Sequence, residues 1–150
     1  MSLKALIVDD EPFVREDLRQ MLTAHEEIKV VGEAGTIAEA RKLLSAQRFH
    51  LVFLDIQLRG GSGFDLVPHI DRTTQIIFVT AHDKYAVRAF EINALDYLLK
   101  PVTYARLAAS LSRLKSSRKV SRREKPGAFR PDDRVLVKTD TGQQFVNLDE

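Results

Sequence analysis

Residues 3–10 read Leu-Lys-Ala-Leu-Ile-Val-Asp-Asp, a short apolar run that ends in two carboxylates. Similar runs occur at residues 51–54, before Asp55, and at residues 76–79, before Thr80. Runs of this length are typical of central parallel strands, which are buried on both faces. Two more mixed segments have the character of edge strands, namely residues 28–34 and residues 94–99.

Between these strands the apolar residues recur with the period of an α-helix. One helix is expected after Pro12, which suits a first helical turn, and another after the capping-box sequence at residues 36–39. Three more are expected from Gly63, around residues 85–90 and after Pro101. Strand and helix therefore alternate five times in about 117 residues, which predicts an open α/β sheet with helices on both faces.

The residues that directly follow the strands carry the chemistry, because ligands of such sheets bind beyond the carboxyl ends of the strands. These residues are Asp9, Asp10, Asp55, Thr80 and Lys100. Crowded carboxylates repel one another, so one of them takes up a proton unless a cation neutralises the group. Mg²⁺ suits this set, because it binds one or two carboxylates together with waters and substrate phosphate.

This site predicts phosphoryl transfer to an aspartate. Mg²⁺ would bridge Asp10, Asp55 and a phosphoryl oxygen, and Asp55 would attack phosphorus to give an acyl phosphate. Lys100 would neutralise a second phosphoryl oxygen, and Thr80 would donate a hydrogen bond to a third.

Two alternatives compete with this interpretation. Each group taken alone fits a helix cap or a surface charge, but five suitable groups at successive strand ends favour a functional site. An enzyme is the second alternative, as a Mg²⁺-dependent phosphatase with an aspartyl nucleophile. The dehalogenase-like version needs an acid two residues after the nucleophile, where this chain has Gln57.

The combination resembles the receiver domains of two-component response regulators over about residues 3–117. The resemblance rests on Asp9-Asp10, Asp55 with Gly63 downstream, Thr80-Ala81 and Lys100-Pro101. It implies a flavodoxin-like (βα)5 receiver fold with a parallel sheet in the order 2-1-3-4-5. It also implies that a histidine kinase phosphorylates Asp55, and that the domain assists this transfer without being a separate enzyme.

The resemblance implies a ligand set for the metal as well. Asp9, Asp10 and Asp55 would hold Mg²⁺ together with the backbone carbonyl of Gln57. The peptide bond between Lys100 and Pro101 would be cis, which would aim the lysine at the site.

A switch is implied on the neighbouring surface. On phosphorylation, Thr80 would move toward the phosphoryl group and the ring of Tyr97 would turn into the vacated space. The surface formed by the fourth helix, the fifth strand and the fifth helix would then change, as a two-state population shift. A homodimer on activation is expected through this surface, with Ala86, Ala89, Phe90 and Tyr97 on the candidate face. The simpler interpretation of Tyr97 is an edge-strand aromatic side chain.

The net charge of +2 is distributed unevenly. Residues 1–112 hold 13 basic and 15 acidic side chains, residues 113–134 hold nine and three, and residues 135–150 hold one and three. We therefore expect a receiver domain at residues 1–117 and a basic linker at residues 118–133.

Residues 134–150 read as two short strands around a turn, a C-terminal β-hairpin stub. A lone hairpin is marginally stable in water, so we expect the chain to be cut inside a second domain. These residues and residues 94–101 resemble response regulators of the LytTR type. That resemblance implies transcription regulation through DNA binding by the missing C-terminal domain. The alternative is a receiver that acts through protein contacts alone.

The composition excludes several other classes. Without any Cys, the chain has no disulfide framework, no thiolate zinc site and no thiol nucleophile. No apolar run approaches the roughly 20 residues that span a bilayer. We expect a cytoplasmic protein with no membrane partner.

Overall fold

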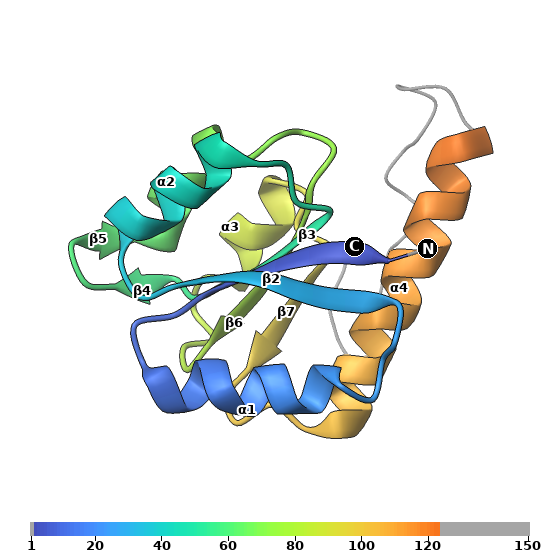
Figure 1. Ribbon diagram of the computed structural model, residues 1–150, viewed down its shortest axis with the longest axis horizontal. Coiled ribbons are helices and arrows are strands. Elements are labelled where there is room, and N and C mark those ends of the chain that lie inside the picture. Colours follow the sequence, from blue (N-terminus) through green and yellow to red (C-terminus); the bar gives the residue numbers. More distant parts are fainter. Residues whose placement is uncertain (1, 124–150) are drawn as a thin grey trace. The chain divides into compact units, whose positions relative to one another are not determined.

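Five parallel strands form the central sheet, in the order β2-β1-β3-β6-β7 (Figure 1). The computed structural model describes residues 2–123, with side chains up to residue 114. The strands are β1 (Leu3–Val8), β2 (Ile28–Ala34), β3 (Leu51–Leu54), β6 (Gln75–Thr80) and β7 (Asp96–Leu99). The strand order confirms the predicted flavodoxin-like arrangement, including the two edge positions.

Helices cover both faces of this sheet. The helical elements are α1 (Pro12–Leu22), α2 (Ile37–Ala46), the 3-10 helix η1 (Gly63–His69), α3 (Ala86–Glu91) and α4 (Tyr104–Arg123). Figure 1 shows α2 and α3 on one face and α1 on the other. The first turns of α4 lie on the α1 side, because Arg106 and Ser110 bond to Asp96, whose neighbour Tyr97 points to the opposite face.

Alternation along the central strands explains why they are apolar without interruption. Leu6 and Val8 of β1 belong to the core beneath α2 and η1. Ala5 and Ile7 are equally buried, because they point to the face that α1 covers. A strand with helices on both sides therefore has no polar face.

The two long N-terminal helices begin much as the sequence predicts. Pro12 opens α1. Thr36 caps α2, and its hydroxyl accepts a hydrogen bond from the backbone N–H of Glu39 at 3.1 Å. The reciprocal half of the predicted capping box is shifted by one residue, because the Glu39 carboxylate accepts from the N–H of Gly35 at 2.8 Å.

The segment after β3 differs from the simple helix expected there. It first forms a small hairpin of β4 (Gln57–Leu58) and β5 (Gly61–Ser62). Gly60 turns this hairpin with a φ of 91°, which favours glycine. The helix that follows is 3-10 rather than α, and it contains Pro68, which has no N–H to donate.

The expected linker beyond residue 123 and the expected strands at residues 134–150 lie outside the described residues. Among the helices that the structure describes, none combines the length and apolar character needed to cross a bilayer.

Candidate functional site

Three carboxylates meet at the carboxyl edge of the sheet. Asp9 follows β1 and is 2% exposed, with its N–H donating to the carbonyl of Ala34 at 3.0 Å. Asp55 follows the adjacent strand β3 and is 5% exposed, with its N–H donating to the carbonyl of Val8 at 3.0 Å. Asp10 is half-buried beside Asp9. Backbone hydrogen bonds of the sheet therefore fix the positions of two of these three residues.

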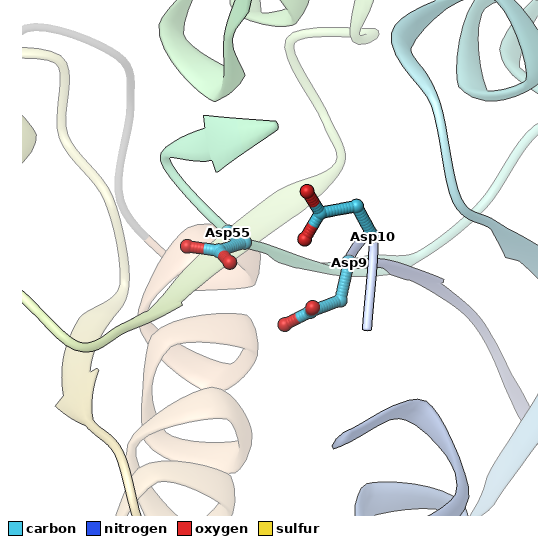
Figure 2. A group of neighbouring side chains, drawn as sticks. All are labelled: Asp9, Asp10 and Asp55. Carbon is cyan, nitrogen blue, oxygen red and sulfur yellow. The ribbon is translucent and has the colours of Figure 1, made fainter. Parts of the chain in front are cut away.

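We call Asp9, Asp10 and Asp55 the acid cluster. One carboxylate oxygen of each residue lies within 4.8 Å of the others, and Figure 2 shows the three side chains gathered at the strand ends. Oxygen atoms at this spacing repel when ionised, and a hard divalent cation relieves that repulsion. The donor set fits Mg²⁺.

Lys100 reaches this cluster from the end of β7. Its Nζ lies 2.9 Å from an Asp9 oxygen, 2.9 Å from an Asp55 oxygen and 3.7 Å from a Glu11 oxygen. Its backbone N–H donates to the carbonyl of Thr80 at 2.9 Å. The peptide bond from Lys100 to Pro101 is cis.

Burial and charge act in opposite directions on these groups. Burial raises the pKa of Asp9 and the neighbouring Asp55 adds to this, although the N–H of Glu11 and the amine of Lys100 oppose it. Burial alone would lower the pKa of Lys100, but its hydrogen bonds to Asp9 and Asp55 outweigh this and raise that pKa. The lysine therefore stays charged, and it partly neutralises the cluster.

Thr80 and Tyr97 lie on adjacent strands beside the cluster. Thr80 is fully buried, and its hydroxyl accepts a long hydrogen bond from the N–H of His82 at 3.4 Å. Tyr97 is half-buried, with its ring centroid 6.3 Å from that of Phe78. Its hydroxyl donates to the carbonyl of His82, and burial raises its pKa to about 12. Both side chains thus contact the same loop residue.

The loop that follows Asp55 folds back at Gly63 and packs against the backbone of Asp55. A Cβ placed on Gly63 would lie 2.1 Å from the backbone oxygen of Asp55, so no other residue fits without movement. The N–H of Gly63 donates to the carbonyl of Ile56 at 2.6 Å. The side chain of Gln57 is exposed, and its amide donates to the Tyr85 hydroxyl at 3.4 Å.

The structure brings Asp9, Asp10, Asp55 and Lys100 together, as the sequence predicts. It also shows contacts that sequence reasoning missed. Glu11 lies near the lysine, and Arg15 of α1 donates from Nη1 to the backbone carbonyl of Asp9 at 2.5 Å. The available signal for Arg15 was its place three residues before the buried Leu18, on the inner stripe of α1.

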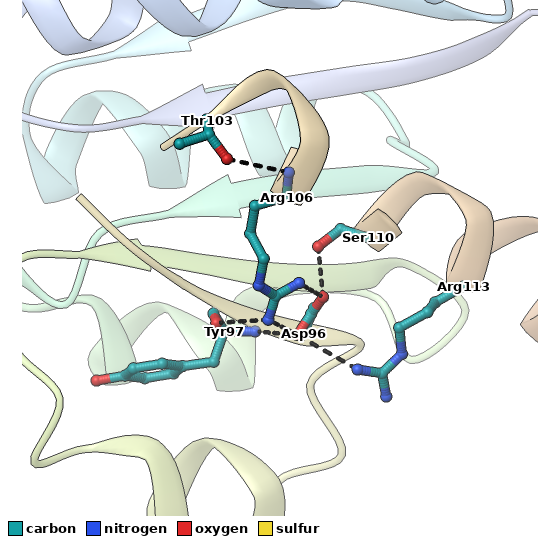
Figure 3. Close-up of polar contacts among 6 residues, drawn as sticks. All are labelled: Asp96, Tyr97, Thr103, Arg106, Ser110 and Arg113. Atoms are coloured by element: carbon teal, nitrogen blue, oxygen red, sulfur yellow. Dashed lines mark hydrogen bonds and ion pairs between the residues drawn. The ribbon is translucent and has the colours of Figure 1, made fainter. Parts of the chain in front are cut away.

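A second polar cluster, also missed, surrounds Asp96 of β7 (Figure 3). Arg106 donates to both Asp96 oxygens, at 2.8 and 3.0 Å, and Ser110 donates to one of them. Arg113 approaches to 3.3 Å. Burial alone would raise the pKa of Asp96, but the hydrogen bond and charge of Arg106 outweigh it, so this pKa lies below its usual range. The cluster ties α4 to β7.

Comparisons with known proteins agree with this geometry. A family model described as the response regulator receiver domain matches residues 5–112. The transcriptional regulatory protein BtsR of Escherichia coli is 44% identical over 118 residues, which cover 77% of this chain and 49% of that protein. The sensory transduction protein LytR of Staphylococcus epidermidis is 44% identical over 115 residues, which cover 75% of this chain and 46% of that protein.

One solved structure supports the same assignment. The REC domain of AraT, a response regulator from Geobacillus stearothermophilus, matches with a TM-score of 0.72 and 29% identity. The match covers 81% of this chain and 99% of that one. The chain spans about half the length of the curated relatives that it matches.

Proposed function

The chain belongs to the response regulator receiver domain family of two-component signalling systems, and on that premise we propose that Asp55 accepts a phosphoryl group from a histidine kinase. The observation that carries this proposal is the acid cluster with the Lys100 amine 2.9 Å from both Asp9 and Asp55. A group of carboxylates with the Lys100 ammonium between two of them suits the transfer of a charged phosphoryl group, because the positive charge is already in position.

The transfer forms one bond and breaks another. A carboxylate oxygen of Asp55 bonds to phosphorus while the bond from phosphorus to the donor imidazole nitrogen breaks, and the imidazole leaves with the electron pair. Lys100 then neutralises one phosphoryl oxygen, and the Thr80 hydroxyl donates a hydrogen bond to another. Both residues act by stabilising charge rather than by forming bonds.

Asp9, Asp10, Asp55 and the backbone carbonyl of Gln57 would hold Mg²⁺. When bound, this ion neutralises charge that develops on the phosphoryl oxygens. The residues of the chain keep the geometry ready for it, because Asp9 and Asp55 are held by backbone hydrogen bonds to Ala34 and Val8.

Intact-mass spectrometry tests the phosphoacceptor directly. After incubation with Mg²⁺ and acetyl phosphate, the wild-type chain gains one phosphoryl group and Asp55→Asn gains none. Asp71→Asn is the matched control, because it makes the same chemical change at an exposed residue. Labelling that persists in Asp55→Asn, or an unchanged mass in the wild type, contradicts the proposal.

We propose that Thr80 and Tyr97 transmit the phosphorylated state. Their shared contact, His82, supports this, because movement of the Thr80 hydroxyl toward a phosphoryl group ends its bond to the N–H of His82. NMR shifts at α3 and β7 should then accompany binding of beryllium fluoride as a phosphoryl mimic. Spectra in which these elements stay unchanged while the acid cluster responds contradict the switch.

The output is proposed to be transcription regulation by a cytoplasmic protein of the LytTR type, which dimerises on activation. The names of the relatives support the regulation, and an apolar surface supports the dimer. That surface, the α3-β7-α4 face, exposes Val87, Phe90, Leu99 and Tyr104, whereas Ala89, expected from the sequence as a contact, is buried in the core. The full-length gene product with beryllium fluoride should sediment as a dimer and bind its promoter DNA more tightly. An unchanged monomer with unchanged DNA affinity contradicts this.

A further inference from the structure

Arg15 joins the acid cluster to the edge strand of the sheet. Its Nη1 donates to the backbone carbonyl of Asp9 at 2.5 Å, and its Nε donates to a carboxylate oxygen of Glu33 on β2 at 3.2 Å. The side chain is 20% exposed, so it runs beneath the surface rather than into solvent. A planar guanidinium can hold two acceptors at once in this way, since its donors form a rigid fork.

The accepting carbonyl belongs to the peptide group between Asp9 and Asp10. The other side of Asp9 is already fixed, because its N–H donates to the carbonyl of Ala34. Its side chain is fixed too, with one oxygen accepting from the N–H of Glu11 at 2.9 Å and the other 2.9 Å from the Lys100 amine. The orientation of the peptide group between Asp9 and Asp10 sets the position of the Cα of Asp10, and so the direction of its side chain. Arg15 holds that orientation.

The charge of Arg15 makes this placement informative. A guanidinium beside the acid cluster repels a divalent cation, so electrostatics alone would favour a neutral residue here. Glu33 offsets the charge, and Arg19 also pairs with Glu33, with its Nε 2.6 Å from the second carboxylate oxygen. Arg19 therefore shares the ion pair with Arg15 but makes no contact with Asp9 that the structure shows.

We propose that Arg15 is a positioning residue for the Asp9–Asp10 pair, and that Mg²⁺ affinity depends on the orientation that its hydrogen bond to the Asp9 carbonyl imposes. The proposal rests on the proposed function, because that function assigns Mg²⁺ to the acid cluster. It goes further by giving a role to Arg15, for which the structure shows an ion pair with Glu33 and none with a carboxylate of the acid cluster.

Isothermal titration of Mg²⁺ into the 150-residue chain, with Arg15→Gln and Arg19→Gln side by side, tests the proposal. Both substitutions remove one positive charge and one partner of Glu33, but only Arg15→Gln removes the hydrogen bond to Asp9. Electrostatics predicts that both bind Mg²⁺ more tightly. Positioning predicts that Arg15→Gln binds about tenfold more weakly, as losses of groups that orient metal ligands do. Arg19→Gln should stay within about twofold of the wild type on this view.

Mg²⁺ affinity in Arg15→Gln that equals or exceeds that of the wild type overturns the inference, and so does equal weakening in both variants. If Arg15→Gln does not melt cooperatively, Arg15→Lys decides by the same criterion, because an ammonium cannot reproduce the planar fork. Phosphorylation of the wild type is measured in the same preparation. If the wild type is phosphorylated and Arg15→Gln binds Mg²⁺ with the wild-type affinity, this inference alone is refuted. If the wild type binds no Mg²⁺, the proposed function is refuted as well.

Discussion

At the scale of single residues, Lys100 and Gly63 both contribute to the position of Asp55, one through its charge and the other through its lack of a side chain. Lys100 places a charge 2.9 Å from its carboxylate, whereas Gly63 contributes the absence of a side chain behind its backbone. Lys100 was predictable as the group at the end of the last strand. The reason for Gly63 was not predictable, because the close approach depends on how the β4–β5 hairpin folds back.

Gly63→Ala should damage both stability and phosphorylation. The added Cβ would lie 2.1 Å from the backbone oxygen of Asp55, so the strand end must move. Overpacking of this kind costs about 2 kcal/mol of unfolding free energy. The displaced carboxylate should slow phosphorylation by up to about a hundredfold. Urea unfolding and timed mass spectrometry with acetyl phosphate measure the two effects.

Gly60→Ala is the matched control for this substitution. Its Cβ would meet nothing within 4 Å, but its φ of 91° is strained for alanine. It should cost about 1 kcal/mol of stability and leave the phosphorylation rate unchanged. A Gly63→Ala chain that is phosphorylated at the wild-type rate would show that the contact does not position Asp55.

At the scale of elements, α4 is held to β7 by charge as well as by apolar packing. Leu107 and Leu111 bury the inner face of α4, and Asp96 adds an ionic contact between the two elements (Figure 3). The Asp96 oxygen that accepts from the Tyr97 N–H at 2.8 Å also binds Arg106. The start of α4 and the backbone of the proposed switch residue thus share one carboxylate.

Asp96→Asn should destabilise the chain at neutral pH. Asp96 is buried, but the Arg106 side chain is 47% exposed and water can solvate it, so the loss should be about 2 kcal/mol, the value of a hydrogen bond to a charged group. Urea unfolding measures the loss, with Asp71→Asn as the control, because its carboxylate pairs with Arg48 at the exposed surface. Equal effects of the two substitutions would contradict a structural role for the Asp96 cluster.

The difference in unfolding free energy between the wild type and Asp96→Asn should depend on pH. The pKa of Asp96 is lowered on folding from its ordinary value of 3.8, so its ionised form stabilises the fold above that pH. This stability is lost as the pH falls through the lowered folded value. The difference in unfolding free energy between wild type and Asp96→Asn should therefore be constant from pH 7 to about pH 5 and shrink below about pH 4. A difference that persists unchanged to lower pH would assign the effect to packing.

Elements with a clear local period were predictable, and the others were not. The central strands show as apolar runs because both of their faces are buried. The two-residue strands β4 and β5 are too short for any period to appear. The 3-10 form of η1 was likewise hidden, because a segment of seven residues is too short for its apolar pattern to separate a 3-10 helix from an α-helix.

At the scale of the whole molecule, the strand order creates the site. The chain passes from β1 to the edge at β2 and back to β3, so the strands that end in Asp9 and Asp55 become neighbours. Strands β6 and β7 then add Thr80 and Lys100 on the same side. Four segments far apart in the sequence therefore share one edge.

Mg²⁺ should stabilise the whole domain through this edge. A ligand that binds only the folded chain raises its stability by about 2.7 kcal/mol at a concentration one hundred times its dissociation constant. The melting temperature should rise with Mg²⁺, and a chelator should reverse the rise. Asp10→Asn should abolish the rise, whereas Asp17→Asn, an exposed change on α1, should preserve it. A rise of equal size in both variants would place the ion elsewhere.

The division between local and tertiary information follows from the reach of each interaction. Burial on two faces and helical period are local properties, so the α/β class, the strand order by resemblance and the chemical groups at the strand ends could be inferred from the chain alone. The partners of those groups could not. Lys100 and Asp55 are 45 positions apart, and Arg15 and Glu33 are 18 apart, so their contacts depend on the packing of whole elements. An arginine on an inner helix stripe has no assigned acceptor until the sheet edge is placed beside it, and the hydrogen bond of Arg15 to Asp9 exists because α1 and β1 are held together there.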